Sequence, residues 1–200
     1  SVAKDVPQFY EAVVDNLAAV VQYNGHYEVT INTVCNLMTD EASGTPLERF
    51  SQLNSVILNG TWLDHQYSSY LEQLKNTTQR SEGFGYRQWT YQTCTEFGWY
   101  QTSNQKGHPY GNGFPIEFME QSCTDAYGPE FGHNMLERVV AYTNIQYGGK
   151  NPDVDRVVFV HGSIDPWHAM GVLEDLSADS PSIYINGTSH CADMYPDKQG

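Results

Sequence analysis

The 200-residue chain carries 10 Lys and Arg against 24 Asp and Glu, which gives a formal net charge of −14 at neutral pH. This length suits one domain with a substantial core, or one domain and part of another. The negative charge opposes the phosphate attraction behind most non-specific nucleic-acid binding, so we expect no nucleic-acid partner. It suits an extracellular or acidic compartment, although a merely soluble acidic surface explains it equally well. No run of 18 apolar residues is present, so no membrane-spanning helix is predicted.

Helical spacing of apolar residues dominates the first part of the chain. Residues 9–23 place apolar side chains on one broad face, with Asp5 and Pro7 as suitable residues to start a helix. Three further helices are expected at about 29–38, 46–58 and 63–76. Pro46 would begin the second of these three. These four segments predict a helical layer.

The composition changes over residues 81–132, which are rich in Gly, aromatic and polar residues. Little regular structure is expected there, and long irregular loops inside compact domains are often functional. A helix returns at about 131–146 and stops at Gly148 and Gly149.

The last part of the chain has the pattern of a parallel sheet. Residues 157–160, Val-Val-Phe-Val, are typical of a strand buried on both faces. Residues 166–176 predict a helix and residues 182–186 a second strand. The order strand, helix, strand predicts a right-handed parallel crossover.

Cysteines and sequons favour an oxidising route. Cys94 and Cys123 are the preferred disulfide pair, because each lies in a Gly-rich, aromatic, loop-like segment that a staple would help to order. Cys35 is a candidate for a bond outside the chain, and Cys191 has no assigned partner. Three glycosylation sequons begin at Asn59, Asn76 and Asn186.

Asp165 lies just after the first predicted strand and before Pro166. It could simply cap the following helix, which is worth about 1 kcal/mol. His190, however, follows the second predicted strand, and the carboxyl ends of parallel strands form the edge where ligands bind. If the two strands are neighbours or separated by one other strand, their loops bring Asp165 and His190 within hydrogen-bonding reach. An acid and then a histidine after the last strands is the chain order of α/β-hydrolases.

These residue types suit a Ser-Asp-His triad. A serine hydroxyl is a poor nucleophile until an imidazole takes its proton, and a carboxylate fixes the imidazole tautomer. Asp165 would be the orienting acid and His190 the base. The chain contains no Gly-x-Ser-x-Gly motif, and two strands make no stable sheet unaided. We therefore expect the front of the domain, including the nucleophile, to lie outside this chain.

A zinc site is a weaker alternative. His161, His168 and His190 with Asp165 could supply metal ligands, but their spacing matches no zinc signature. We expect neither a metal nor a cofactor.

Three segments carry a resemblance to a known family: WTYQTCTEFGWYQTS (89–103), YGGKNPDVDRVVFVHGSIDPWHAMGV (147–172) and GTSHCADMYP (187–196). They resemble the serine peptidase family of lysosomal Pro-X carboxypeptidase, dipeptidyl peptidase II and thymus-specific serine protease, and are most similar to the thymus-specific type. The resemblance implies an α/β-hydrolase core interrupted by a mainly helical cap. Residues 1–28 would be a core segment following the nucleophile region, residues 29–128 the cap, and residues 129–200 the C-terminal part of the core.

By the same resemblance, the full-length protein would be a lysosomal or secreted serine exopeptidase. It would hydrolyse short peptides through an acyl-enzyme, with cleavage after proline as one option, and this chain alone would be inactive. Asp165 and His190 match the acid and the base of the family. Trp167, Trp99 and Met194 fall where Pro-X carboxypeptidase lines an apolar pocket for proline.

Indole walls would suit a pyrrolidine ring, although ordinary core packing explains Trp99 and Trp167 as well. Glu96 could bind a substrate amine, but an ordinary loop carboxylate is an equal interpretation. A peptide substrate and the N-terminal part of the same protein are the expected partners, and a homodimer is compatible with the sequence. Two alternatives stay open: a hydrolase-like binding module that uses its Tyr-rich loops to hold a partner, and a generic α/β-hydrolase esterase.

Overall fold

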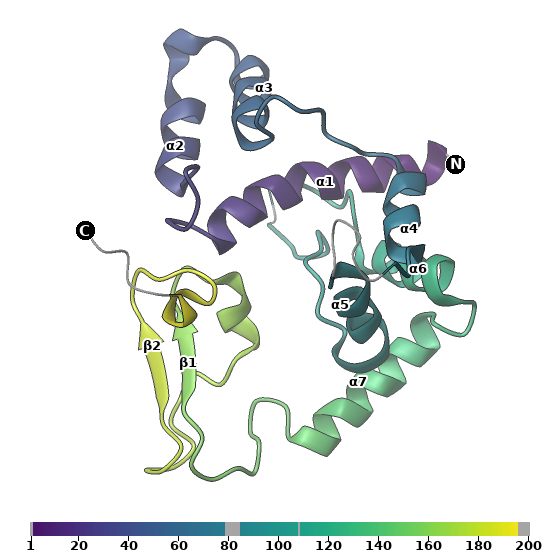
Figure 1. Ribbon diagram of the computed structural model, residues 1–200, viewed down its shortest axis with the longest axis vertical. Helices are drawn as coiled ribbons and strands as arrows, with labels where there is room; N and C mark the ends of the chain where they lie inside the picture. Colours follow the sequence, from purple (N-terminus) through teal and green to yellow (C-terminus); the bar gives the residue numbers. More distant parts are fainter. Residues whose placement is uncertain (1, 79–84, 108, 196–200) are drawn as a thin grey trace. The chain divides into compact units, whose positions relative to one another are not determined.

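The computed structural model describes residues 2–78, 85–107 and 109–195 (Figure 1). The chain forms two compact units: Ser1–Val14 with Leu63–Gly149, and Asp15–Trp62 with Lys150–Gly200. Helix α1 (Val2–Gln22) therefore supplies its first part to the first unit and its last turns to the second. None of the helices in the described ranges combines the length and the hydropathy that crossing a membrane requires.

The first unit is helical. Its core is a cluster of buried side chains to which Tyr67, Phe114, Phe118 and Met119 contribute, with Val14 of α1 packed against it. Four α-helices and one π-helical segment, η2, follow in the described part of this unit. They are α4 (Tyr67–Lys75), α5 (Tyr86–Gln92), η2 (Thr93–Phe97), α6 (Ile116–Tyr127) and α7 (His133–Tyr147). Gly148, with a positive φ of 85°, ends α7 as expected.

The stretch 81–132 contains more regular structure than its composition predicts. Helices α5 and α6 and the segment η2 lie within it, while residues 79–84 and 108 are outside the described residues. A disulfide joins Cys94 of η2 to Cys123 of α6, and both residues are buried. This is the pair that the sequence analysis favours. Tertiary burial and the covalent link thus order a segment in which helix periodicity is weak.

Helix α1 begins at Val2, earlier than expected, and Pro7 lies inside it. Asp5 does not start this helix. Its Oδ1 instead accepts a hydrogen bond of 3.0 Å from the backbone N–H of Tyr67, the first residue of α4. The side chain of Gln66, which precedes α4, makes no capping hydrogen bond, so Asp5 satisfies this N-terminus from a distant part of the chain.

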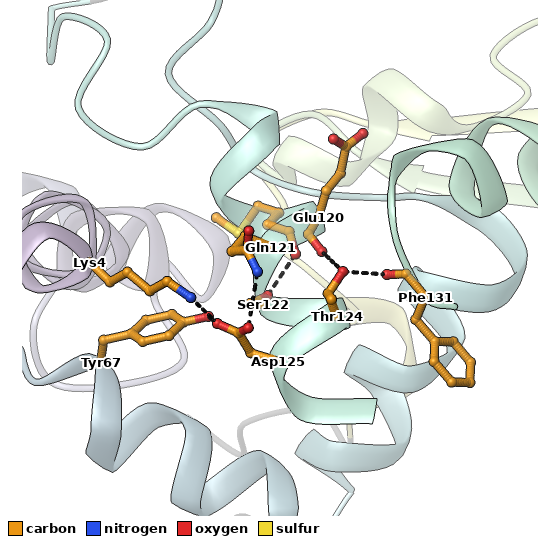
Figure 2. Close-up of polar contacts among 9 residues, drawn as sticks. Lys4, Tyr67, Glu120, Gln121, Ser122, Thr124, Asp125 and Phe131 are labelled. Atoms are coloured by element: carbon orange, nitrogen blue, oxygen red, sulfur yellow. Dashed lines mark hydrogen bonds and ion pairs between the residues drawn. The ribbon is translucent and has the colours of Figure 1, made fainter. Parts of the chain in front are cut away.

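A cluster of polar side chains fastens α1, α4 and α6 together in the first unit (Figure 2). Lys4 forms an ion pair with Asp125, and the Tyr67 hydroxyl donates to Asp125 Oδ2 at 2.8 Å. Gln121 donates to the other carboxylate oxygen at 3.0 Å. Burial alone would raise the pKa of Asp125, but these three donors outweigh it and lower the pKa from its ordinary value.

The second unit contains α2 (Ile31–Thr39), α3 (Pro46–Ile57) and a parallel sheet of β1 (Phe159–Gly162) and β2 (Ser182–Ile185). Thr45 and Glu48 form a capping box at the start of α3, with Pro46 at its first position as expected. The two strands lie side by side in Figure 1, and Val160 is the register partner of Ile183. The chain is thus helix-rich, with a small parallel sheet. The division into core and cap stays a prediction.

Two expectations for the last part of the chain are wrong. Instead of a helix over 166–176, a short 3-10 helix, η3 (Pro166–Met170), ends at Gly171. A Cβ at Gly171 would lie 2.1 Å from the His161 ring, so this close approach requires glycine. The apolar run after Asp155 is also not buried on both faces: Val158, just before β1, is 54% exposed, and Val160, in β1, is 38% exposed.

Candidate active site

Asp165 lies in the turn between β1 and η3, and its two carboxylate oxygens have different partners. Oδ1 accepts a hydrogen bond of 2.9 Å from the backbone N–H of Trp167, which is the N-cap bond of η3. Oδ2 lies 2.8 Å from Nδ1 of His190. Capping and pairing with His190 therefore coexist in one side chain.

His190 follows β2, and its imidazole is partly accessible. The His190 side chain is 30% exposed and that of Asp165 is 13% exposed. An ionised carboxylate only accepts hydrogen bonds, so a neutral imidazole in this contact carries its proton on Nδ1. That tautomer leaves the lone pair on Nε2, which is the arrangement a general base needs.

Backbone contacts join the loops that carry these two residues. Ser163 N–H donates to the Ile185 carbonyl at 3.0 Å and Ile164 N–H to the Thr188 carbonyl at 2.9 Å. A Cβ at Gly162 would lie 2.5 Å from the Thr188 carbonyl oxygen, so the loops meet this closely only with glycine there. The pairing of the strands thus continues beyond their ends and brings the acid to the imidazole.

The last residue of α1, Gln22, and the next residue, Tyr23, contact this pair and were not identified from the sequence. The backbone carbonyl of Gln22 accepts a hydrogen bond of 2.8 Å from His190 N–H, and Gln22 Oε1 accepts one of 2.9 Å from the Trp167 indole. The Tyr23 ring lies edge-on to the His190 ring, with 5.8 Å between centroids. Burial raises the pKa of Tyr23. No local sequence pattern predicts these contacts, because Gln22 and Trp167 are 145 positions apart.

The other residues that the sequence analysis assigned to substrate binding are distributed as follows. Trp167, partly buried, lies beside Asp165 in η3. Met194, in the second unit, is 77% exposed. Trp99 and Glu96 belong to the first unit, where Trp99 lies against Phe97 at 5.1 Å between ring centroids and Glu96 is exposed. The structure thus brings together Asp165, His190 and Trp167.

The residues of the zinc alternative have other contacts. The His168 ring approaches the Asp165 carbonyl and lies edge-on to Tyr184, while the His161 ring lies over Gly171. Within residues 2–78, 85–107 and 109–195, no three His, Cys, Asp or Glu side chains converge on a point that would hold a metal ion.

Possible modification sites lie on the surface. Asn59, Asn76 and Asn186 are exposed, as a glycosylated asparagine must be. Cys35 is an exposed free thiol, and Cys191, next to His190, is a partly buried one. Burial raises the pKa of the Cys191 thiol. Glycosylation stays a prediction.

Comparison with known proteins gives the class of the chain. Residues 1–200 match the family described as serine carboxypeptidase S28. A putative serine protease of Caenorhabditis elegans is 35% identical over 208 aligned positions, which cover 96% of this chain and 40% of that protein. Mouse (Mus musculus) thymus-specific serine protease is 33% identical over 189 positions, covering 90% and 37%. Human lysosomal Pro-X carboxypeptidase is 23% identical over 132 positions, covering 65% and 25%.

The chain therefore belongs to the serine carboxypeptidase S28 family, a family of serine peptidases. It spans about two fifths of the length of the first two relatives. The family resemblance seen in the three sequence segments is confirmed.

Proposed function

We propose that Asp165 and His190 are the acid and the base of a serine exopeptidase that hydrolyses short peptides through an acyl-enzyme. The observation that carries this proposal is the 2.8 Å contact between His190 Nδ1 and Asp165 Oδ2 at the carboxyl end of two parallel strands. The carboxylate holds the imidazole in the tautomer that accepts a proton at Nε2, and it stabilises the imidazolium that forms.

The serine nucleophile would come from a segment of the protein outside these 200 residues. Two observations support this. The relatives are more than twice as long as the stretch they share with this chain. The two-stranded sheet also leaves Val158, Val160 and Ile183 exposed, and a sheet of this size is not stable alone. Further strands would extend this sheet at its edges, the helices that connect parallel strands would cover these side chains, and the serine would lie at the same edge as Asp165 and His190.

Cleavage after proline is the narrower proposal. Its support is the partly buried Trp167 beside Asp165, since an indole presents apolar faces that suit a pyrrolidine ring. One relative also carries the name Pro-X carboxypeptidase. A matched pair of peptides that differ only in Pro or Ala before the scissile bond tests this preference, and equal kcat/KM for the two would refute it.

A lysosomal or secreted location is part of the same proposal. The buried disulfide and the three exposed sequons suit an oxidising route, and one relative is named lysosomal. Treatment of the native protein with an endoglycosidase is expected to lower its mass.

A fluorophosphonate probe tests the central proposal. It reacts with activated serine nucleophiles, so it is expected to label the protein produced from its complete coding sequence. Peptide hydrolysis should fall in parallel with labelling. Absence of labelling and of peptide turnover would favour a hydrolase-like binding module, whereas turnover of esters without turnover of peptides would favour an esterase.

A further inference from the structure

Four hydrogen bonds close a ring through Gln22, Trp167, Asp165 and His190 in the second unit. His190 Nδ1 lies 2.8 Å from Asp165 Oδ2, and Asp165 Oδ1 accepts from Trp167 N–H at 2.9 Å. The Trp167 indole donates to Gln22 Oε1 at 2.9 Å, and the Gln22 carbonyl accepts from His190 N–H at 2.8 Å. Each of the four residues takes part in two of these hydrogen bonds, through two different groups.

We propose that Gln22 is a positioning residue for the Asp165 and His190 pair. This inference rests on the proposed function, because it concerns the reaction that this pair would perform. Gln22 is the last residue of α1, where carbonyl groups lack partners within the helix. Its carbonyl is therefore available to the His190 backbone, while its side chain reaches the Trp167 indole.

The ring matters because both members of the pair lie on loops. A carboxylate can rotate about its last side-chain bond, and such a rotation would turn Oδ2 away from the imidazole. Trp167 N–H holds Oδ1, so the orientation of the carboxylate depends on the position of Trp167. The hydrogen bond from the Trp167 indole to Gln22 holds Trp167 against the end of helix α1, and a helix is a more rigid support than a loop.

The same bond affects what the site presents to a substrate. The indole has a single donor, and Gln22 accepts from it. Trp167 therefore offers mainly its apolar ring to a ligand, which suits a substrate side chain without hydrogen-bonding groups.

Three variants of the protein expressed from its complete coding sequence test the role of Gln22. Gln22→Met keeps the length of the side chain but removes the acceptor oxygen, and its thioether sulfur, at the position of Cδ, is only a weak acceptor. Gln22→Glu keeps an acceptor oxygen, and Val21→Ala changes an exposed neighbour in the same helical turn. Kinetics on a short peptide are combined with proton and nitrogen NMR of the tryptophan indoles, with the Trp167 signal assigned through Trp167→Phe.

Gln22→Met is expected to lower kcat about tenfold, the rate equivalent of one hydrogen bond, and to speed hydrogen exchange of the Trp167 indole about tenfold. Gln22→Glu should restore both quantities to within about threefold of wild type. Val21→Ala should leave both unchanged. Recovery in Gln22→Glu separates positioning from a general loss of packing.

Each other outcome overturns a defined part of the account. Unchanged indole exchange in Gln22→Met would show that the ring is not formed. Faster exchange with unchanged kcat would show that the ring does not position the pair. A protein that fluorophosphonate fails to label would refute the proposed function and, with it, the catalytic role of Gln22, while the indole exchange would still report whether the ring exists.

Discussion

At the residue scale, Asp165 shows what the sequence predicts well and what it does not. Its proximity to His190 was predictable, because both residues follow strands that pair in parallel and so emerge at one edge. The capping bond was predictable from Pro166 at the first position of η3. The contacts of Gln22 were not, because they depend on where the end of α1 lies and involve no motif.

Tyr67 allows a test at the same scale. It is 3% exposed, and its hydroxyl donates to Asp125 Oδ2. Burial, followed by the hydrogen bond to Asp125, raises the pKa of Tyr67, so the hydroxyl stays protonated at any ordinary pH. Tyr67→Phe is expected to lower the free energy of unfolding by about 1 to 2 kcal/mol, because a hydrogen bond to a charged acceptor is lost.

Urea denaturation measures this change as a lower midpoint with an unchanged slope. Tyr142→Phe is the matched control, since Tyr142 is 66% exposed in the same unit. Equal midpoints for the two variants would contradict a stabilising role of the Tyr67 and Asp125 contact.

At the scale of secondary-structure elements, apolar periodicity predicted α2, α3, α4 and α7 with shifts of a few residues at their ends, and it predicted α1 without its first turns, since that helix begins at Val2. It failed for α5, η2 and α6, of which η2 and α6 are joined by the buried disulfide between Cys94 and Cys123. It failed again after Asp165, where Gly171 stops η3 after five residues. Regular structure that depends on distant contacts leaves little local pattern, so composition underestimated the regular structure of residues 81–132.

The contact between His133 of α7 and Glu120 of α6 leads to a prediction at this scale. His133, the first residue of α7, places Nδ1 2.7 Å from Glu120 Oε1 and Nε2 3.5 Å from Glu137 Oε1. The hydrogen bond to Glu120 and the charges of Glu120, Glu137 and Glu117 raise the pKa of His133. The link therefore stabilises the fold fully below the unfolded-state pKa of about 6.5, and the stabilisation is lost as the pH rises through the raised pKa.

His133→Gln should accordingly lower the melting temperature at pH 5 and change it little at pH 9. Thermal unfolding followed by circular dichroism at both pH values measures the difference. Glu120→Gln is the partner control, since it removes the main cause of the raised pKa and should abolish most of the same pH-dependent gain. A destabilisation of His133→Gln that is equal at both pH values would contradict this account.

At the scale of the whole molecule, the sequence predicts the class of protein better than its arrangement. Three motifs in order identified the family, and the family match over residues 1–200 confirms it. The disulfide between Cys94 and Cys123 suits the expected oxidising compartment. The exposure of Val160 in β1 was not expected, since an apolar run does not reveal which other segment covers it.

The turnover of Asp165→Asn tests the central claim most directly. In the protein produced from its complete coding sequence, this variant should lower kcat for a short peptide about 10⁴-fold, because an amide at this position favours the wrong imidazole tautomer. Asp179→Asn, which changes an exposed carboxylate in the same unit, should leave kcat unchanged. Turnover of Asp165→Asn close to that of the wild type would contradict the assignment of Asp165 and His190 as acid and base.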